Sequence, residues 1–445
     1  MQIVILAGGK GTRLASVSGD LPKALVDVAG KTLLERQLEM VAAQGVTDVL
    51  ILTGHMGDQI QAFCGDGARW GLNIRCSQEE APRGTAGALL DAGADLAERF
   101  TVLYGDTVME VDLNRLAKAH GDHGAAATLF LHPNDHPYDS DLVEIDTESW
   151  VSAFHPSPHA PDAELPNLVN AALYVLERDA VLNLSELPPK PDFGKHVFPA
   201  MLRQRLPIFG YVSPEYIKDA GTPDRIEKVR QHIQLGRLAD RSLRTPSAAI
   251  FMDRDGVLNI ERSRISRSQD LQLTPGAAEA VKRINDSRYL GVVVTNQPVI
   301  ARGDCDVAGL GRIHARLDTL LGRHRAYIDA LYFCPHHPDS GFAGERPELK
   351  FACACRKPET GLVDQAASDL NIDLARSWMI GDSTSDIEMA RRAGLRSVLV
   401  RTGLAGGDGR NEVQPDHVAE DLAAAVDLIL KEAADGSLAA GEMMA

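Results

Sequence analysis

The chain has 445 residues, of which 44% are hydrophobic and 24% charged, and its formal net charge is −16. At roughly 150 residues per domain this length predicts two or three domains, and the composition excludes a largely disordered or collagen-like chain. The acidic balance argues against a general nucleic-acid surface or an anionic membrane surface, because both present phosphates to the protein. We therefore expect neither as a partner, whereas small anionic substrates need only a local basic pocket.

Targeting signals and disulfides are not expected. No stretch of sequence approaches the ~20 unbroken apolar residues of a membrane span, and the first residues lack the basic segment and long apolar run of a signal peptide. Six cysteines in a chain of this length do not suggest a disulfide framework. We expect a cytoplasmic protein.

Short apolar runs alternate with helical patterns in both halves of the chain: 2–6, 49–52, 101–104, 248–252, 292–294 and 378–380. This alternation predicts the α/β fold class, with two Rossmann-like domains of mainly parallel strands. In such sheets ligands bind at the carboxyl ends of the strands. Loops rich in glycine or aspartate follow several of these runs, so we expect the functional sites there.

The halves share no repeated motif, and an Arg-rich segment that ends in Thr-Pro-Ser separates them. We predict a first domain over 1–235, a linker over 236–247 and a second domain over 248–434. The Ala/Gly-rich stretch 435–445 is predicted to be a flexible tail.

A glycine-rich loop follows the first strand. Gly8, Gly9 and Gly11 let backbone N–H groups approach an anion, Arg13 can hold phosphate oxygens bidentately, and Lys23 supplies a second cation. Such a loop alone is a weak signal, and a simple tight turn stays open as the alternative. It matches neither the Walker pattern nor G-x-G-x-x-G.

Four motifs in order sharpen this interpretation: residues 6–14 with 22–25, Gly84-Thr85-Ala-Gly, Tyr104-Gly-Asp106 and Lys218-Asp219-Ala-Gly-Thr-Pro. Together they resemble the sugar-1-phosphate nucleotidyltransferases, of the heptose 1-phosphate guanylyltransferase type, over residues 1–232. The resemblance implies a GT-A-like fold in which a sugar phosphate attacks the α-phosphorus of an NTP and expels pyrophosphate. It implies that Arg13 holds the leaving pyrophosphate, that Lys23 contacts the sugar phosphate, and that Asp106 and Asp219 bind Mg²⁺. The nucleotide contacts that it implies are Gly8, Gly9, Gly11, Thr12, Gly84 and Thr85.

One departure concerns the sugar side. The family usually has a Glu-Lys pair near position 153, and this chain reads Ala-Phe-His-Pro-Ser-Pro-His over 153–159. His155 and His159 are candidates to replace the pair, with surface histidines as the plainer interpretation. Lys195 is another candidate cation for the sugar phosphate.

Carboxylates follow the strands of the second half. Asp253 and Asp255 end one strand, Thr295 and Asn296 end the next, and Asp382 and Asp386 follow a third, with Lys357 between. One carboxylate can attack phosphorus while the other donates a proton to the leaving alkoxide. A turn at Gly256 is expected to bring both toward one site.

These elements resemble the haloacid-dehalogenase-like (HAD-like) phosphatases over 248–403. The resemblance implies that Asp253 is the nucleophile and Asp255 the general acid and base. Thr295 and Lys357 bind the phosphoryl group, which Asn296 borders. Mg²⁺ would be held by Asp253, the backbone carbonyl of Asp255 and Asp382, with Asp386 behind them. Only 39 residues separate Asp255 from Thr295, too few for a cap domain.

A cysteine and histidine cluster lies between these motifs. Cys334-Pro-His336 and, after sixteen residues, Cys353-Ala-Cys355 offer four N/S ligands for a tetrahedral zinc ion. Because the protein fills all four positions, we interpret the zinc as structural. His337 could take the place of His336 as a ligand. The alternative is that the cysteines are unrelated buried thiols. The loop and Arg356-Lys357 resemble the heptose 1,7-bisphosphate phosphatase branch, which implies a distal-phosphate or sugar contact for Arg356.

The two halves together predict a bifunctional enzyme with Mg²⁺ in both sites and structural zinc in the second. The second half would remove the 7-phosphate of D-glycero-D-manno-heptose 1,7-bisphosphate, and the first would transfer GMP from GTP to the heptose 1-phosphate. Other sugar phosphates, or an N-terminal half that only binds nucleotide, are the alternatives. Partners are the small-molecule substrates; a homo-oligomer stays open.

Overall fold

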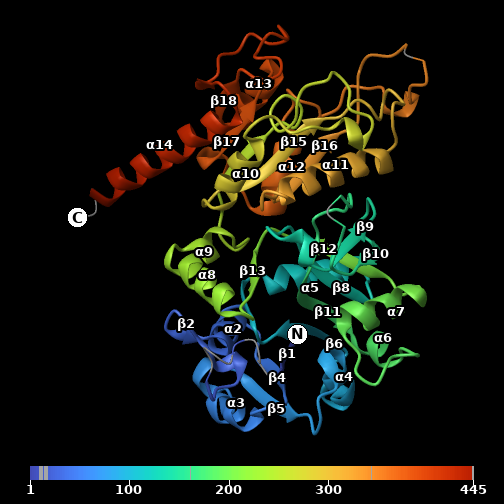
Figure 1. Ribbon diagram of the computed structural model, residues 1–445, viewed down its shortest axis with the longest axis vertical. Coiled ribbons are helices and arrows are strands. Elements are labelled where there is room, and N and C mark those ends of the chain that lie inside the picture. The colour runs from blue at the N-terminus through green and yellow to red at the C-terminus, as the bar shows by residue number, and fades with distance from the viewer. Residues whose placement is uncertain (10–13, 15–18, 161, 342, 443–445) are drawn as a thin grey trace. The chain divides into compact units, whose positions relative to one another are not determined.

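The computed structural model describes residues 1–9, 14, 19–160, 162–341 and 343–442, and the chain divides into two compact units. The first unit comprises Met1–His132, Asp139–His159 and Leu168–Arg244. The second comprises Pro133–Tyr138, Ala160–Asn167 and Thr245–Ala445. Each unit has its own sheet and its own core (Figure 1).

The first unit is built on a nine-stranded sheet in which β1 pairs in parallel with β4 and β6, and β4 with β5. The strands are β1 (Gln2–Ala7), β4 (Asp48–Thr53), β5 (Asn73–Gln78), β6 (Arg99–Tyr104), β8 (Ala127–His132), β9 (Leu142–Ile145), β10 (Val151–His155), β11 (Val169–Glu177) and β12 (Ile208–Val212). Ile3, Val4 and Ile5 are fully buried. Continuous burial is typical of a strand covered on both faces, and it explains the unbroken apolar run.

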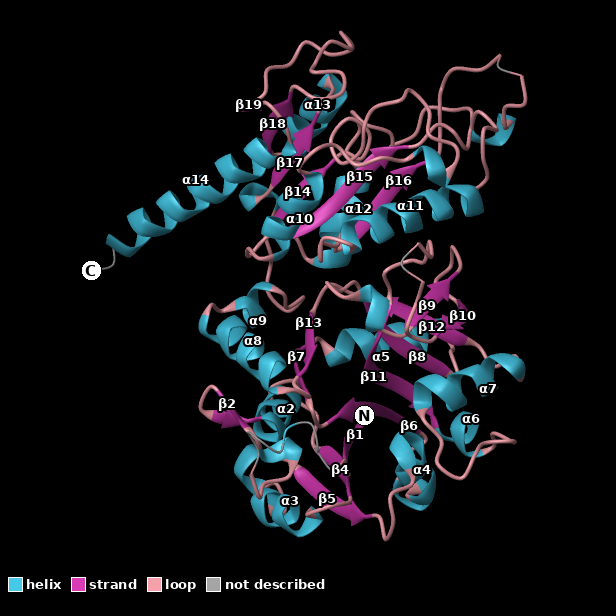
Figure 2. Ribbon diagram, viewed as in Figure 1, coloured by secondary structure: helices cyan, strands magenta, loops and turns pink. Residues whose placement is uncertain are grey.

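Helices flank this sheet (Figure 2). They are α2 (Leu33–Ala42), α3 (Gly57–Cys64), α4 (Gly84–Asp91), α5 (Leu113–His123), α6 (Arg178–Leu182), α7 (Phe198–Arg203), α8 (Pro223–Gln234) and α9 (Arg237–Asp240). The side chains of Thr32, Asp112 and Thr222 cap α2, α5 and α8 by accepting backbone N–H groups. Two short ladders complete the unit: β2 (Asp27–Val28) with β3 (Lys31–Thr32), and β7 (Thr107–Glu110) with β13 (Tyr216–Asp219).

The segment predicted as a linker over 236–247 is instead largely packed on the first unit. It contains α9, and Arg241, Ser242 and Leu243 are buried. The buried carboxylate of Glu215 accepts hydrogen bonds from the backbone N–H groups of Asp112 (2.8 Å) and Leu243 (3.3 Å). Sequence composition did not reveal this anchor, because Glu215 lies far from the segment that it holds.

The second unit has a six-stranded sheet, β16-β15-β14-β17-β18-β19, in which all neighbouring strands are parallel. Its strands are β14 (Ala249–Met252), β15 (Leu290–Asn296), β16 (Ala330–Cys334), β17 (Trp378–Gly381), β18 (Arg396–Val400) and β19 (His417–Ala419). Its helices are α10 (Ala277–Asn285), α11 (Val307–Gly322), α12 (Gly361–Leu370), α13 (Thr384–Ala393) and α14 (Leu422–Glu442). The predicted α/β class with mainly parallel sheets is confirmed.

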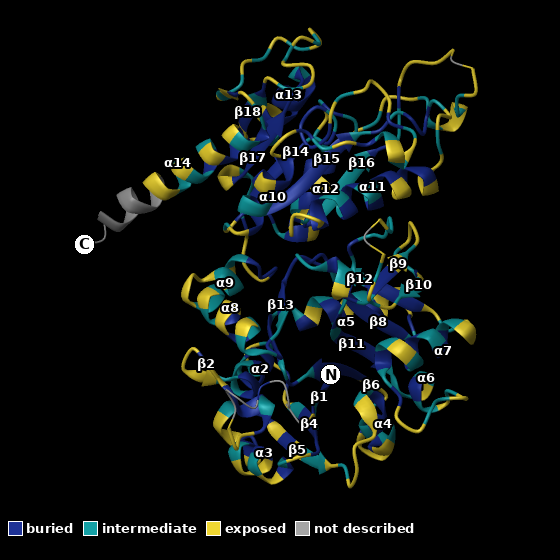
Figure 3. Cartoon of the chain, viewed as in Figure 1, coloured by how far each residue is buried: buried dark blue, intermediate teal, exposed yellow. Residues whose placement is uncertain are grey.

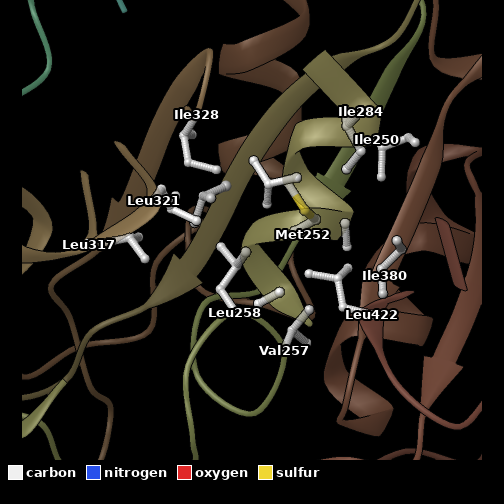
Figure 4. Close-up of a cluster of buried hydrophobic side chains, with 14 of the residues drawn as sticks. Ile250, Met252, Val257, Leu258, Ile284, Leu317, Leu321, Ile328, Ile380 and Leu422 are labelled. Atoms are coloured by element: carbon white, nitrogen blue, oxygen red, sulfur yellow. The ribbon is translucent and has the colours of Figure 1, made fainter. Parts of the chain in front are cut away.

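The core of the second unit lies around its central strand. Ile250 and Met252 of β14 pack with Ile284 of α10, Ile380 of β17 and Leu422 of α14, all at most 1% exposed (Figure 4). Figure 3 shows the same burial along β14, β15 and β17. Because this cluster packs the helices against one face of the sheet, the loops that follow the strands leave the sheet at defined positions.

Short helical turns connect the elements of both units: η2 (Lys23–Leu25), η3 (Ala68–Trp70), η4 (Gly93–Asp95), η5 (Pro137–Asp139), a π-helix η6 (Phe193–Val197), η7 (Ser268–Asp270), η8 (Pro347–Leu349) and η9 (Leu374–Arg376). At the other end of the chain, α14 continues to Glu442, into the stretch predicted as a tail. Alanine, which is frequent there, has the highest helix propensity.

A first prediction concerns Gly381, where β17 ends. A Cβ added at this position would lie 2.2 Å from the Cβ of Asp386. Gly381→Ala is therefore expected to destabilise the second unit by about 1–3 kcal/mol, the usual cost of overpacking. Urea unfolding measures it. Gly311→Ala in α11 is the control, because no atom lies within 4 Å of the added Cβ; equal unfolding midpoints for both variants would contradict the prediction.

Candidate active sites

A cavity of about 370 Å³ lies where the four parallel strands of the first unit end. Ala7 ends β1 and Gly8 and Gly9 follow it, His55 follows β4, Glu79 follows β5, and Tyr104 ends β6 before Gly105 and Asp106. Its other lining residues are Leu6, Lys23, Ala24, Leu52, Pro82, Gly84, Thr85 and Ala88. Since Gly84 and Thr85 begin α4, the cavity combines strand ends with a helix N-terminus, as expected for a phosphate site.

The glycine loop is described only in part. Gly8 and Gly9 line the cavity, and a Cβ at Gly8 would lie 2.9 Å from Oε1 of Glu79. Gly8 therefore allows a close approach of the two loops. Gly11, Thr12 and Arg13 lie outside the described residues, so their roles stay predictions.

Two aspartates from distant parts of the chain meet beside Lys23. The antiparallel β7–β13 ladder places Asp219 opposite Thr107, and the N–H of Ala220 donates to the carbonyl of Asp106 (2.9 Å). The Lys23 ammonium contacts Asp106 and lies 4.0 Å from Oδ1 of Asp219. The structure thus brings Lys23, Asp106 and Asp219 together, which spacing alone could not establish.

These aspartates fit a divalent cation. Oδ1 of Asp219 is a buried oxygen without a hydrogen-bond partner among the described residues, and Mg²⁺ takes oxygen ligands of this kind. Arg225 of α8, which the sequence analysis missed, contacts the other oxygen of Asp219. Its position three residues after the N-cap Thr222 directs it back toward the strand end.

The sugar side is less complete. Lys195 is exposed on the π-helix and lies outside the residues that line the cavity. His155 pairs with Glu144 (3.1 Å), and His159 contacts the carbonyl of Ser140 (2.8 Å). All three stay predictions as replacements for the missing pair.

A second cavity, of about 310 Å³, lies at the carboxyl ends of the neighbouring strands β14, β15 and β17. Asp253, Asn296 and Asp382 follow or end these strands, and Lys357 joins them. The remaining lining residues are Asp255, Glu261, Arg262, Ser263, Arg264, Ile265, Gln297, Pro298, Val299, Arg302, His337, Arg356, Ser383, Ser385, Leu404 and Arg410. The strand order therefore concentrates the residues predicted from the second half at one edge.

The buried ammonium of Lys357 holds this edge together. Its Nζ lies 2.9 Å from Oδ2 of Asp253 and 2.6 Å from Oδ1 of Asp386, and it donates to the carbonyl of Val294 (3.0 Å). Burial alone would lower the pKa of Lys357, but the two carboxylates raise it above its usual value. The lysine therefore stays charged. Asn296 fixes its backbone through bonds of 3.0 and 3.2 Å.

Three carboxylates form a candidate divalent-metal site. One oxygen each of Asp253, Asp382 and Asp386 lies within 4.8 Å of the others. Burial, followed by repulsion among these groups, raises the pKa of Asp253 and of Asp382. A bound cation would remove that repulsion, so the residues fit Mg²⁺. Asp386 also accepts from the N–H and hydroxyl of Ser383; its place behind the ligands stays a prediction.

The turn after β14 brings Asp255 to the same cavity. Gly256 has φ +79°, and a Cβ there would lie 2.2 Å from Oδ2 of Asp382, so glycine is required. Burial would raise the pKa of Asp255, but the Arg254 guanidinium and neighbouring donors outweigh it and lower this pKa. Thr295 is also buried here, and its hydroxyl accepts from Gln297 (2.9 Å).

The four predicted N/S ligands also lie together. Sγ of Cys334 is 3.5 Å from that of Cys353 and 3.3 Å from that of Cys355, and Nδ1 of His336 is 3.4 Å from Sγ of Cys355. All four ligand atoms lie within 4.8 Å of one another. Such spacing suits a tetrahedral ion. His337 instead faces the second cavity.

A cationic rim surrounds the second cavity. Arg356 donates to the carbonyl of His336 (3.1 Å), and Arg302 contacts Nε2 of His337 (3.2 Å). With Arg410 they line the same space. The sequence analysis named only Arg356 of these three, because no motif marks the loops that carry the other two.

Sequence comparison supports both halves. The nucleotidyl transferase family profile matches residues 2–235, and the HAD-hydrolase-like profile matches residues 354–425. D-glycero-D-manno-heptose-1,7-bisphosphate 7-phosphatase of Thermosynechococcus vestitus is 42% identical over 191 residues, which are 41% of this chain and 96% of that protein.

Two solved structures are similar to the separate halves. HddC from Yersinia pseudotuberculosis, complexed with GMP-PN, is 26% identical and covers 52% of this chain and 99% of its own, with a TM-score of 0.45. The D,D-heptose 1.7-bisphosphate phosphatase from B. bronchiseptica, complexed with magnesium and phosphate, is 33% identical and covers 42% of this chain and 99% of its own, with a TM-score of 0.37.

The two domains and the comparisons define a bifunctional enzyme of sugar-phosphate metabolism, with a nucleotidyltransferase activity and a phosphatase activity. The chain belongs to the nucleotidyl transferase family through residues 2–235, and its C-terminal half belongs with the heptose-bisphosphate 7-phosphatases. Among the described residues, no helix has the length and apolar character needed to span a bilayer.

Proposed function

We propose that the chain carries out consecutive steps of nucleotide-activated heptose synthesis. The C-terminal half hydrolyses the 7-phosphate of D-glycero-D-manno-heptose 1,7-bisphosphate, and the N-terminal half converts the remaining heptose 1-phosphate and GTP to GDP-heptose and pyrophosphate. The observation that carries the proposal is the meeting of Asp253, Lys357 and Asp382 in a half that is 42% identical to a named heptose-bisphosphate phosphatase.

In the phosphatase half, Asp253 attacks the 7-phosphorus and forms an aspartyl-phosphate while the bond to the sugar oxygen breaks. Asp255 protonates that oxygen, and then takes a proton from the water that hydrolyses the aspartyl-phosphate. Lys357 and Thr295 hold the phosphoryl oxygens. Mg²⁺ on Asp253, Asp382 and the Asp255 carbonyl supplies charge neutralisation when bound.

The cationic rim is suited to the distal phosphate of a bisphosphate. Arg356, Arg302 and Arg410 line the cavity that also contains Asp253, and guanidinium groups bind phosphate oxygens bidentately. A monophosphate bound at Asp253 has no second phosphate to place against these guanidinium groups. The rim therefore supports a bisphosphate substrate.

In the transferase half, an oxygen of the sugar phosphate attacks the α-phosphorus of the NTP as the bond to the pyrophosphate oxygen breaks. Lys23 lies between the two aspartates and can orient the phosphates. Mg²⁺ on Asp106 and Asp219 supplies charge neutralisation when bound.

Glu79 supports guanine as the base. Its Oε2 accepts from the N–H of Arg83 (3.1 Å), and its carboxylate lines the cavity. An ionised carboxylate only accepts hydrogen bonds. Guanine is the base that presents two adjacent donors, N1–H and the 2-amino group, on one edge, so it matches an acceptor-only side chain.

The second prediction tests the two activities together. Given the heptose bisphosphate, Mg²⁺ and GTP, the purified protein is expected to release both inorganic phosphate and pyrophosphate. Asp253→Asn should abolish phosphate release from the bisphosphate, and Asp106→Ala should abolish pyrophosphate release, because each removes a carboxylate from a different site.

Heptose 1-phosphate is the control substrate: Asp253→Asn should still convert it with GTP. Loss of pyrophosphate release from heptose 1-phosphate in Asp253→Asn, or of phosphate release from the bisphosphate in Asp106→Ala, would contradict independent sites. A hexose phosphate preferred by orders of magnitude in kcat/KM would support the alternative of another sugar, and pyrophosphate release with none of the sugar phosphates would support a nucleotide-binding module.

The third prediction concerns the base. Glu79→Gln replaces one acceptor by an amide donor, so it should reduce kcat/KM for GTP by at least about 10-fold and narrow the preference for GTP over UTP. Pyrophosphate release with each of the four NTPs measures this. Glu80→Gln is the matched control. An unchanged order of NTP preference would remove Glu79 as the base contact.

The fourth prediction concerns zinc. We expect one zinc ion per chain by elemental analysis, and its loss in Cys355→Ser, because a serine hydroxyl is a poor substitute for a thiolate ligand. Cys76→Ser, outside the cluster, should keep the metal. Thermal unfolding of the second unit should shift downward in Cys355→Ser and upon chelation. Zinc-free native protein would contradict the prediction.

A further inference from the structure

The side chain between the two phosphatase aspartates is fully buried. Arg254 has no solvent exposure and is the largest side chain in the described residues with so little. Its guanidinium contacts the neighbouring carboxylate: Nη2 donates to both oxygens of Asp255 at 2.9 Å, and Nε donates to Oδ1 at 3.3 Å. Arg254 therefore directs its donors toward Asp255, and not into the cavity.

Two further donors complete the surroundings of this carboxylate. Asn259 donates to Oδ1 (2.9 Å) and Gln297 donates to Oδ2 (2.7 Å). Both residues are at most 2% exposed. We name Arg254, Asn259 and Gln297 the Asp255 clamp. Because it holds both oxygens from several directions, rotation of the Asp255 side chain would break several bonds at once.

Packing alone does not account for an arginine here. Burying a guanidinium is costly, and an apolar side chain of similar volume is often as stable or more so. Nη1 of Arg254 has no hydrogen-bond partner among the described residues, which adds to that cost. The bidentate contact with Asp255 is therefore the interaction that this position gains from arginine.

We propose that Arg254 is a positioning residue for proton transfer, which fixes Asp255 in the orientation that reaches the leaving oxygen; the inference rests on the role proposed above for Asp255. In the first step the proton moves from the protonated form of Asp255 to the leaving oxygen as its bond to phosphorus breaks, and the N–H donors of the clamp stabilise the carboxylate that this transfer leaves behind. In the second, a proton moves from water to the Asp255 carboxylate as the water oxygen bonds to the phosphorus of the aspartyl-phosphate. The Asp255 side chain is 25% exposed, and the clamp keeps this exposed part directed toward the cavity.

This role has a distinctive signature, because proton donation matters only when the leaving group is a poor one. The probes are 4-nitrophenyl phosphate, whose leaving phenolate needs no proton, and glycerol 1-phosphate, whose leaving alkoxide does. General acid catalysis contributes about 10²- to 10⁴-fold. Arg254→Met should lower kcat/KM for glycerol 1-phosphate by about 100-fold and that for 4-nitrophenyl phosphate by less than about 3-fold.

Three comparison variants separate the explanations. Asp255→Ala should show the same selective loss. Arg254→Lys keeps the positive charge but lacks the planar guanidinium, so it should show much of the same selective decrease in kcat/KM for glycerol 1-phosphate. Arg391→Met on α13, where the arginine pairs with Glu388 at the surface, should leave both rates unchanged.

Equal losses with both probes, or no loss with either, would overturn the proposal. Selective loss in Asp255→Ala but not in Arg254→Met would overturn the positioning role alone, whereas no selectivity in Asp255→Ala would overturn the assignment of Asp255 and the inference with it. If circular dichroism shows that Arg254→Met does not fold, Gln297→Met decides. It removes one of the two donors to Oδ2, and a loss that is not selective for glycerol 1-phosphate would overturn the clamp.

Discussion

The concentration of negative charge at strand ends is the constraint on which both sites depend. Parallel strands bring their carboxyl ends to one edge, and in this chain those ends carry aspartates that lie close together. Carboxylates this close repel one another, and burial, together with this repulsion, raises the pKa of Asp253 and of Asp382. The fold is compatible with them only because lysine and arginine side chains, and a divalent cation when bound, offset the repulsion.

The two units meet this constraint differently. In the first, Lys23 and Arg225 contact aspartates that are about a third exposed, with side-chain exposures of 32% for Asp106 and 36% for Asp219. Solvent screens such pairs, so the side chains can exchange partners when a nucleotide arrives. In the second unit Lys357 is 2% exposed and binds two carboxylates at once. That site is held in one geometry before substrate binds, which suits the covalent aspartyl-phosphate step that we propose for Asp253.

The sequence predicted the strand ends of both units and the residues that follow them, because apolar runs and the loops after them are local signals. The meeting of Asp106 and Asp219 was foreseen only through a family resemblance, since the β7–β13 ladder that joins them is long-range. Arg254 and Glu215 were missed for a related reason. From sequence alone a charged residue is expected at the surface. Only the surrounding structure shows that Arg254 and Glu215 are buried with several hydrogen-bond partners. Because the burial of Glu215 was missed, the segment 236–247 that it helps to anchor was predicted as a linker.

The cysteine and histidine cluster lies close in sequence to Lys357 of the candidate phosphatase site. Cys355 is two residues before Lys357, and Arg356 between them donates to the carbonyl of His336, which is itself a predicted ligand. Any ion that ties Cys355 to Cys334 therefore also ties the backbone of Lys357 to the end of β16. Asn296 of β15 holds the same backbone from the other side. Lys357, which we propose to bind phosphate, lies on an irregular segment, and an ion bound by the cysteine cluster would add a restraint of the kind that a strand or helix provides elsewhere.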